Sequence, residues 1–450
     1  MSIPSYLVAI FGGAVSGAEA AYQFTQRGIR CVVFEQNTLP YGKIEDGLPK
    51  WHVKLRDKEE ERINEKLSHP LVNYVPNVRL GKEIDFEDVA RNWGFSAVLL
   101  AIGAWKDRPL GIDGVDDYIG KGLIYQNPFI YWFNHKHEPG YSGEQYEVKD
   151  DAIVIGGGLA SLDVVKVLMI ESVEAALKAH GHDVDLFTLD RSIAKVLEAK
   201  GLTLDNLGVK GCTLYYRRRI KDMPLSPMAT DTPEQLVKAE SVREKVLNNY
   251  ASKYLFRVQP LHVPVDKIVE EGMLAGLIMQ ETKIENGRAV PVPGSEKEVR
   301  GPYVISSIGS IPELIPGIPE KWGMYQVADE NVCRITGYEN VFAIGNAVTG
   351  RGNINESLKH GKEVSERILS AYIEKPVAVA TEIAIEHRET SVATAVDGLL
   401  PRIKQLDATD FTRITERVRE LQEQSGYTGD FRAWVSQHLP VRLETIIGHD

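Results

Sequence analysis

Two glycine-rich turns constrain the fold of this chain more than any other feature. The first follows the apolar run 8–11 and reads Gly12-Gly13-Ala14-Val15-Ser16-Gly17; the second follows 152–155 and reads Gly156-Gly157-Gly158-Leu159-Ala160-Ser161. Each leads from a strand-like run into a helix-like run, where free N–H groups of the helix N-terminus can meet phosphates. One such turn is a weak signal, because glycine also serves ordinary strand-to-helix connections. Two of them predict two dinucleotides bound in neighbouring sites.

The composition is that of a globular protein without a membrane span. The 450 residues are 43% hydrophobic, enough for several domains with cores. The longest apolar runs fall well short of the roughly 18 residues that a membrane span needs. The N-terminal residues lack the pattern of a signal peptide, so we expect a cytoplasmic protein that binds no membrane. The net charge of −11 argues against binding to nucleic acid.

The three cysteines, Cys31, Cys212 and Cys333, are far apart in the sequence, and no Cys-x-x-Cys occurs. This spacing excludes a redox-disulfide reductase, and an all-cysteine iron–sulfur cluster needs four cysteine ligands. We therefore expect three small buried residues and no metal site.

The first unit predicts a helix over 16–27 that ends at Gly28 and a strand over 31–34. An acidic residue about 20 positions after the glycine turn holds the adenosine ribose in such units, and Glu35 stands there. The residues expected to bind the first dinucleotide are therefore Gly12, Gly13, Ala14, Ser16, Gly17, Glu35 and Gln36.

The second unit predicts a helix over 159–169, a helical insertion over about 172–211 and a strand over 213–216. Arg217, Arg218 and Arg219 follow that strand, where an NAD site places an acidic residue and an NADP site places arginine. The planar guanidinium can hold a 2′-phosphate by two charge-assisted hydrogen bonds. NADPH is therefore the expected ligand of Gly156, Gly157, Gly158, Leu159, Ala160, Arg217 and Arg218.

Two charged or amphipathic segments have simpler interpretations. The run 50–66 mixes basic and acidic residues, which is typical of a solvated helix face. In the tail, Thr409-Asp410 is expected to cap a helix that ends at Ser425-Gly426. Its apolar stripe (Phe411, Ile414, Val418 and Leu421) indicates core packing and leaves open a homodimer or partner contact.

Several ordered segments resemble the adrenodoxin reductase-type ferredoxin–NADP reductases. They are 40–52, 103–112, 156–163 and 306–309. The run 216–224 is closer to the related glutamate synthase small-subunit flavoproteins. The resemblance covers about residues 7–370. It implies an α/β chain with two Rossmann-like dinucleotide-binding domains, the glutathione reductase-like FAD/NAD(P) fold, plus a helical C-terminal extension.

The resemblance divides the chain into a discontinuous FAD domain (1–112 and 308–375), an NADPH domain (113–307) and an extension (376–450). It implies that FAD takes a hydride from NADPH and passes single electrons to ferredoxin or a flavodoxin-like carrier. It also implies that His52 and Asp163 form a catalytic polar pair near the flavin and the nicotinamide. Further FAD contacts are expected from Gly42, Gly103, Gly345, Asn346, Gly352, Asn353 and Ile354.

The sequence departs from the family pattern at two FAD positions. Ala14 replaces the second glycine of the first turn and adds a methyl group beside the pyrophosphate, and Gly345-Asn346 replaces Gly-Trp or Gly-Asp. We expect Ala14 to shift the backbone slightly without abolishing FAD binding, and Asn346 can still donate or accept a hydrogen bond. Two alternatives stay open: a flavoprotein subunit of a larger glutamate synthase-like complex, and a flavin- or nucleotide-binding sensor without turnover.

Overall fold

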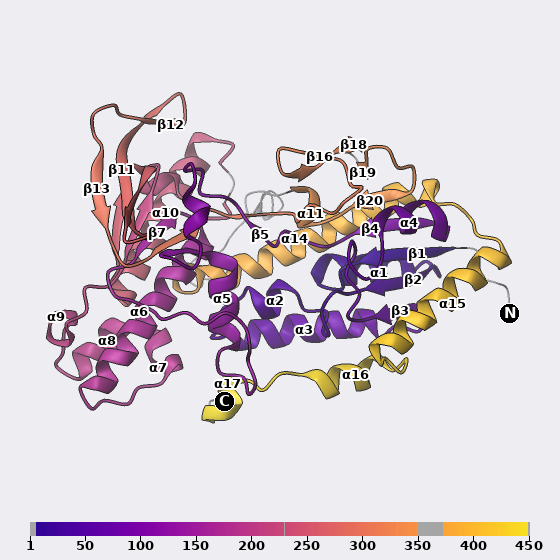
Figure 1. Cartoon of the computed structure of the whole chain (residues 1–450), viewed down its shortest axis with the longest axis horizontal. Helices are drawn as coiled ribbons and strands as arrows, with labels where there is room; N and C mark the ends of the chain where they lie inside the picture. The colour runs from indigo at the N-terminus through magenta and orange to yellow at the C-terminus, as the bar shows by residue number, and fades with distance from the viewer. Residues whose placement is uncertain (1–5, 229, 331, 350–371, 449–450) are drawn as a thin grey trace.

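The computed structural model describes residues 6–228, 230–330, 332–349 and 372–448. Two mainly parallel sheets follow one another along the long axis of the molecule, and helices cover them (Figure 1). The α/β class predicted from the doubled turn is confirmed. None of the helices in the described ranges combines the length and the apolar character needed to cross a bilayer.

The first sheet takes its strands from both ends of the chain. They are β1 (Leu7–Phe11), β2 (Arg30–Phe34), β3 (Val72–Val75), β4 (Ala97–Leu100), β18 (Val327–Asp329), β19 (Arg334–Ile335) and β20 (Val341–Ala343). Their order is β18-β19-β20-β4-β1-β2-β3, and β20, β4, β1, β2 and β3 run parallel. Every residue of β1 is buried, as expected of a central parallel strand with both faces covered.

The second sheet is entirely parallel. Its strands are β6 (Leu123–Tyr125), β7 (Ile153–Gly156), β8 (Thr213–Tyr216), β9 (Arg257–Pro260) and β14 (Val304–Ser307), in the order β6-β14-β7-β8-β9. An antiparallel layer lies beside it, made of β10 (His262–Glu270), β11 (Met273–Glu285), β12 (Arg288–Pro291) and β13 (Lys297–Arg300). Each glycine-rich turn thus follows a central strand of its own sheet, β1 or β7.

Two of the segments that connect the sheets pair with each other: β5 (Lys106–Asp107) runs antiparallel to β15 (Ser310–Ile311). The ammonium of Lys43 donates to Asn127 Oδ1 and Ser310 Oγ, each at 3.2 Å. Asn127 Nδ2 donates to the carbonyl of Trp105 at 2.8 Å. These hydrogen bonds tie both connecting segments to Lys43, the first residue of α2 (Lys43–Asp46).

The helices cover both sheets and form the C-terminal extension. They are α1 (Val15–Thr25), α2 (Lys43–Asp46), α3 (Val53–Leu67), α4 (Phe86–Asp88), α5 (Gln126–His135), α6 (Leu159–Ala179), α7 (Leu186–Arg191), α8 (Ile193–Ala199), α9 (Leu204–Leu207), α10 (Pro233–Tyr254), α11 (Asn346–Thr349), α14 (Pro376–Leu399), α15 (Ala408–Ser425), α16 (Phe431–His438) and α17 (Leu443–Ile447). Shorter elements are η1 (Val89–Trp93), η2 (Val115–Tyr118), η3 (Ile220–Asp222), η4 (Leu400–Arg402), β16 (Glu320–Lys321) and β17 (Met324–Tyr325).

The helix after the second turn is longer than the sequence predicts. Its expected end was Met169, but α6 continues to Ala179 because Ile170, Val173 and Leu177 keep the helical spacing and are all buried. The predicted helical character of the insertion is confirmed: α7, α8 and α9 follow α6 and pack into the same core.

Helix α15 of the C-terminal extension packs against the first sheet. Ile414 and Val418 are buried in the core, with Phe411 and Leu421 packed against it, so the predicted stripe is core packing. The predicted cap was wrong by two residues: Asp407, rather than Thr409-Asp410, is the N-cap and accepts the N–H of Asp410. Since the chain itself covers this stripe, a homodimer would need another surface of the extension.

The charged run on α3 is a solvated face only in part. The residues exposed to solvent, as predicted, are Lys54, Asp57, Lys58, Glu61 and Glu65. Arg62 and Lys66 instead form ion pairs with Glu389 of α14, each at 2.5 Å, and Arg56, whose side chain is only 7% exposed, pairs with Glu444 of α17. The prediction missed these contacts because helices more than 300 positions away in the sequence supply the covering residues.

The cysteine prediction was right for two positions and wrong for the third. Cys31 and Cys212 are buried, and burial raises the pKa of the Cys212 thiol to about 12. Cys333 is partly exposed, because it lies in the turn before β19 with φ of +49° rather than within the sheet. All three thiols are free.

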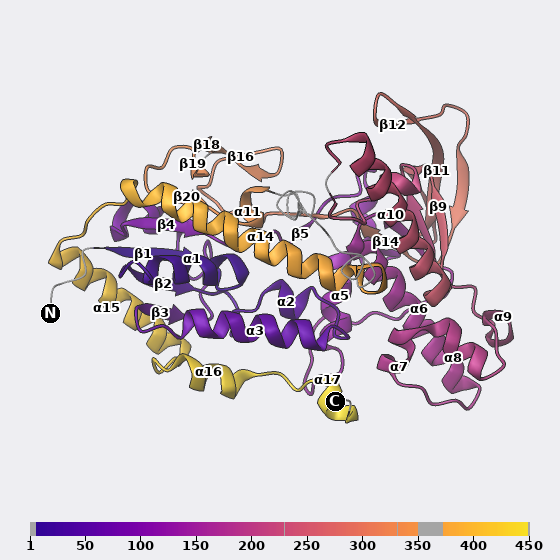
Figure 2. The same cartoon turned by 180° about the vertical axis from the view of Figure 1, so that it is seen from behind.

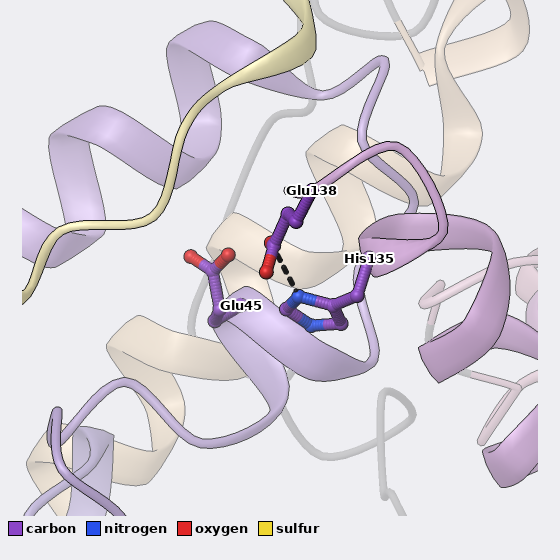
Figure 3. A group of neighbouring side chains, drawn as sticks. All are labelled: Glu45, His135 and Glu138. Atoms are coloured by element: carbon purple, nitrogen blue, oxygen red, sulfur yellow. Dashed lines mark hydrogen bonds and ion pairs between the residues drawn. The ribbon is translucent and has the colours of Figure 1, made fainter. Parts of the chain in front are cut away.

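A polar cluster joins α2, α5 and the C-terminal segment (Figure 3). The ligand-type atoms of Glu45, His135 and Glu138 lie within 4.8 Å of one another, but each already has a protein partner. His135 hydrogen-bonds Glu138 at 2.6 Å and Asp46 at 3.1 Å, and Arg442 pairs with Glu45. Burial lowers the pKa of His135, but the two carboxylates outweigh it and raise that pKa to about 9.

Replacing His135 with Gln is expected to destabilise the fold in a pH-dependent way. The folded pKa of about 9 lies above the ordinary 6.5. The stability that the charged imidazole contributes is therefore fully present below pH 6.5 and is lost as pH rises through 9. Thermal unfolding from pH 6 to 10 should show a gap between wild type and variant that narrows with pH. A constant gap would contradict the assignment, and the exposed His180→Gln serves as the control.

Candidate functional site

A cavity of about 400 Å³ opens where the first glycine turn meets the C-terminal half of the chain. It lies beyond the carboxyl ends of β1 and β2, where open α/β sheets bind their ligands. Its size is within the range of ligand pockets. Of the residues predicted to act or to bind a cofactor, those that line it are Gly12, Ala14, Ser16, Glu35, Gln36, Gly42, Gly103, Leu159, Ala160, Asp163 and Asn346.

The glycines of the first turn leave no room for side chains. A Cβ atom at Gly12 would lie 2.6 Å from the carbonyl oxygen of Ala101, and φ at Gly12 is +98°. A Cβ at Gly17 would lie 1.8 Å from the carbonyl oxygen of Gly12. The sequence thus allows helix α1 to start directly against β1. This close approach is what lets backbone N–H groups reach a pyrophosphate.

Ala14 fits the turn without strain. It is the N-cap of α1 with φ of −71°, a conformation open to any residue, and it lines the cavity. No side chain caps the helix, and its first turn holds no acidic residue. The N-terminus of α1 therefore offers its N–H groups and partial positive charge to the cavity.

Glu35 lies at the end of β2 and is 4% exposed. Its carboxylate accepts the N–H of Gly13 at 2.8 Å and that of Asn37 at 3.0 Å. Burial raises its pKa to about 7, although these hydrogen bonds oppose the shift. Glu35 therefore holds the turn and the β2 loop in place while it faces the cavity. A ribose contact at Glu35 stays a prediction, as does one at the exposed Gln36.

The remaining residues expected to contact FAD differ in whether they line the cavity. Gly42 and Gly103 line the cavity with positive φ of +52° and +70°. Gly345 has φ of +64°, and a Cβ there would lie 2.2 Å from Ser16 Oγ. Asn346 begins α11 on the cavity wall. Gly352, Asn353 and Ile354 fall outside the described residues.

The second turn is packed as tightly as the first. A Cβ at Gly156 would lie 2.1 Å from Ser161 Oγ, and one at Gly157 would lie 2.2 Å from the ring of Tyr216. Gly158 is the N-cap of α6, which has no side-chain cap and no acidic residue in its first turn. Helix α6 therefore presents a second open N-terminus, and its residues Leu159 and Ala160 reach the cavity of the first turn.

The three arginines after β8 have different environments. The Nε and Nη2 atoms of Arg219 each donate a hydrogen bond to the carboxylate of Asp222 at 2.8 Å. Arg217 is exposed and forms no ion pair within the described residues. Arg218 Nε has no hydrogen-bond partner there, but it forms an ion pair with Asp222 Oδ2 at 3.6 Å. The structure thus leaves Arg217 open to a phosphate, while Arg218 and Arg219 share Asp222.

His52 and Asp163 are not joined by a hydrogen bond in the described structure. Asp163 lines the cavity, whereas His52 caps α3 and does not. Burial and the nearby Lys166 lower the pKa of His52 well below 6.5, and burial raises the pKa of Asp163 to about 7. His52 Nε2 and Asp163 Oδ1 are both buried without a hydrogen-bond partner in the described ranges. Their catalytic role stays a prediction.

Sequence reasoning missed one wall of the cavity, which α14 supplies. Figure 2 shows this helix crossing from the side of the second sheet over α1. The residues that line the cavity recur every three or four positions: Val377, Ala380, Thr381, Ala384, Ile385 and Arg388. That spacing, with its two alanines, is visible in the sequence and could have identified a helix packed on a ligand. Lys43 and Trp105 are further lining residues that sequence reasoning did not select.

The cavity fits a long dinucleotide with a central diphosphate. The first turn provides an open helix N-terminus, two glycines that a Cβ would block, and an acidic residue at the ribose position. The lining also includes the apolar side chains of Leu48, Trp105 and Leu159, which suit a flavin ring system. These features match the expectation of FAD at the first turn.

No family model matches the sequence. Among curated proteins, the NADPH-Fe(3+) oxidoreductase subunit beta of Geobacter sulfurreducens is 27% identical over 332 residues, 70% of this chain and 39% of that protein. The glutamate synthase [NADPH] small chain of Azospirillum brasilense is 25% identical over 393 residues, 83% of this chain and 69% of that one. The NADPH-ferredoxin reductase FprA of Mycobacterium leprae is 24% identical over 371 residues, 74% and 75% of the two chains.

Among solved structures, Mycobacterium tuberculosis FprA in complex with NADPH superposes with a TM-score of 0.67 at 18% identity. The match covers 94% of this chain and 91% of that one. It shows that the two chains share a two-domain FAD/NAD(P) fold. Together with the sequence matches, it confirms the resemblance of this chain to the adrenodoxin reductase-type ferredoxin–NADP reductases and the glutamate synthase small-subunit flavoproteins.

Proposed function

We propose that this chain is an FAD-dependent NADPH oxidoreductase that passes single electrons to ferredoxin or a similar carrier. One observation carries the proposal: Leu159, Ala160 and Asp163 of α6 line the cavity that the first turn forms. A nicotinamide that extends from the second turn along the start of α6 would therefore enter the flavin site. Bound FAD would supply the chemistry, accepting a hydride and releasing electrons one at a time.

The chain itself supplies binding, orientation and electrostatics. The two helix N-termini bind the diphosphates, and Arg217 and Arg218 hold the 2′-phosphate of NADPH. Because its pKa is raised to about 7, Asp163 can hold a proton on the cavity wall near neutral pH. His52 stays neutral, because its pKa is lowered by burial and by Lys166. We propose that this pair orients the nicotinamide and adjusts the charge beside the reacting rings.

The test is to mix the purified, FAD-loaded protein with NADPH without oxygen. The flavin absorbance is expected to bleach, and NADH is expected to act far more slowly. An unchanged flavin spectrum would overturn the enzymatic function and would favour a nucleotide-binding sensor. Absence of bound flavin after reconstitution with FAD would overturn the cofactor assignment itself.

A subunit of a larger reductase is the second candidate. The chain spans only 39% of the first curated relative, which is itself named a subunit. Rates of cytochrome c reduction with and without added ferredoxin should separate the two candidates, since a free reductase is expected to be stimulated strongly. A stable larger partner that co-purifies, without stimulation by ferredoxin, would favour the subunit. A cytoplasmic location and a homodimer stay predictions.

A further inference from the structure

Arg388 on α14 lies in the wall of the cavity close to the first turn. A Cβ built on Gly345 would lie 3.8 Å from Arg388 Cδ and 2.2 Å from Ser16 Oγ. Ser16 is in the first turn of α1, and Ser16, Asn346 and Arg388 all line the same cavity. The guanidinium therefore stands at the end of the cavity where the N-terminus of α1 opens.

Arg388 forms no ion pair and no hydrogen bond with any residue that the structure describes, although its neighbour Glu389 binds Arg62 and Lys66. Three carboxylates line the cavity: Glu35 binds backbone N–H groups, and Glu313 pairs with Arg79 at 2.8 Å. The third, Asp163 on α6, forms no ion pair with Arg388. A charge that is removed from water and left unpaired destabilises the fold that carries it. Burial accordingly lowers the pKa of Arg388.

A second cation faces the same cavity. Lys43 lines it, and burial lowers the pKa of its ammonium to about 8, with Arg388 adding to the shift. The open N-terminus of α1 contributes a further partial positive charge. Two cations and a helix N-terminus around one cavity call for a ligand with more than one negative charge. A free flavin, which has no phosphate, would leave this charge without a partner.

We infer that Arg388 binds the diphosphate of FAD, opposite the N-terminus of α1. This inference rests on the proposed function, because FAD is the ligand. The planar guanidinium can donate two N–H groups to phosphate oxygens, while the turn supplies backbone N–H groups from the other side. Helix α14 thus becomes part of the cofactor site: its small residues Ala380 and Ala384 admit the cofactor, and Arg388 closes one side of the diphosphate.

The test is to titrate the apoprotein of the full chain with FAD and with riboflavin, which lacks phosphate. Arg388→Gln is expected to weaken FAD by about 10- to 100-fold, the effect of one charge-assisted hydrogen-bonded contact. Riboflavin affinity should change less than about twofold, because riboflavin cannot use the guanidinium. Arg388→Lys should keep most of the FAD affinity. Glu386→Gln, exposed on the same helix, is the matched control.

A second readout separates a ligand contact from a structural role. Arg388→Gln and Arg388→Met both remove a charge that has no partner among the described residues. Each variant should therefore leave the melting temperature of the apoprotein unchanged or raise it. A lower apoprotein melting temperature in both neutral variants, or equal losses of FAD and riboflavin, would overturn the inference. Unchanged FAD affinity in Arg388→Gln would overturn this inference and leave the proposed function intact. A wild-type chain that binds no FAD would overturn both.

Discussion

Replacing Arg217 and Arg218 with Ala together is expected to weaken NADPH binding by at least 100-fold and to leave NADH binding within a few-fold. A hydrogen bond to a charged group contributes about 1.5–3 kcal/mol, and 1.4 kcal/mol corresponds to a tenfold change in affinity. NADH lacks the 2′-phosphate, so it loses nothing when the guanidinium groups are removed. The measurement is the dependence of flavin bleaching on each nucleotide's concentration under anaerobic conditions.

Arg219→Ala is the matched control, because the same strand end carries it but Asp222 already engages its guanidinium. Arg219→Ala is expected to change the affinities for NADPH and NADH by the same factor, because Arg219 acts only on the loop that it braces. Equal losses of NADPH and NADH affinity in the Arg217/Arg218 double variant would contradict the phosphate assignment. In that case Arg218 would act with Arg219 through the ion pairs that both form with Asp222.

The parts of the site that the sequence predicts correctly are those that local geometry determines. A glycine is required at positions 12, 17, 156 and 157, since a Cβ there would meet atoms between 1.8 and 2.6 Å away. Such a requirement limits the residue type at a fixed spacing, and the spacing is visible in the chain. The same holds for Glu35, which closes the first turn through Gly13 only 22 positions away.

The parts that the sequence does not predict depend on contacts between distant segments. Glu389 and Glu444 form ion pairs with charged residues of α3, and α14 supplies one wall of the cavity. Neither contact leaves a periodic signal in α3 or in the glycine turns. The α14 pattern of small and apolar residues indicates a packed helix, but nothing in it indicates which surface the helix covers. Composition alone therefore suggests a solvated face where the structure has ion pairs.

Helix α14 also changes how the irregular first turn is understood. In sequence terms, Ala14 removes a family glycine beside the pyrophosphate. In the structure, position 14 has φ of −71°, so glycine is not needed there, and Arg388 adds a cation to the same end of the cavity. The strict requirement for glycine falls three positions later, where α1 passes the backbone of Gly12.

Gly17→Ala is therefore expected to be the most damaging single change in the first turn. The added methyl would lie 1.8 Å from the oxygen and 2.9 Å from the carbonyl carbon of Gly12, so backbone must move. Overpacking costs about 1–3 kcal/mol and more where no flexible side chain can yield. The variant should melt at a lower temperature and lose FAD, which thermal unfolding and the release of flavin fluorescence would measure.

Ala14→Gly is the counterpart, because it restores the family pattern at a position that does not require it. Position 14 is the N-cap of α1, where glycine is preferred over alanine, so the backbone freedom that glycine adds costs little there. The variant is expected to keep its FAD and to melt within a few degrees of wild type. If Ala14→Gly lost FAD while Gly17→Ala retained it, the diphosphate would not lie against the start of α1. A protein in which both variants kept FAD would bind its flavin without the first turn.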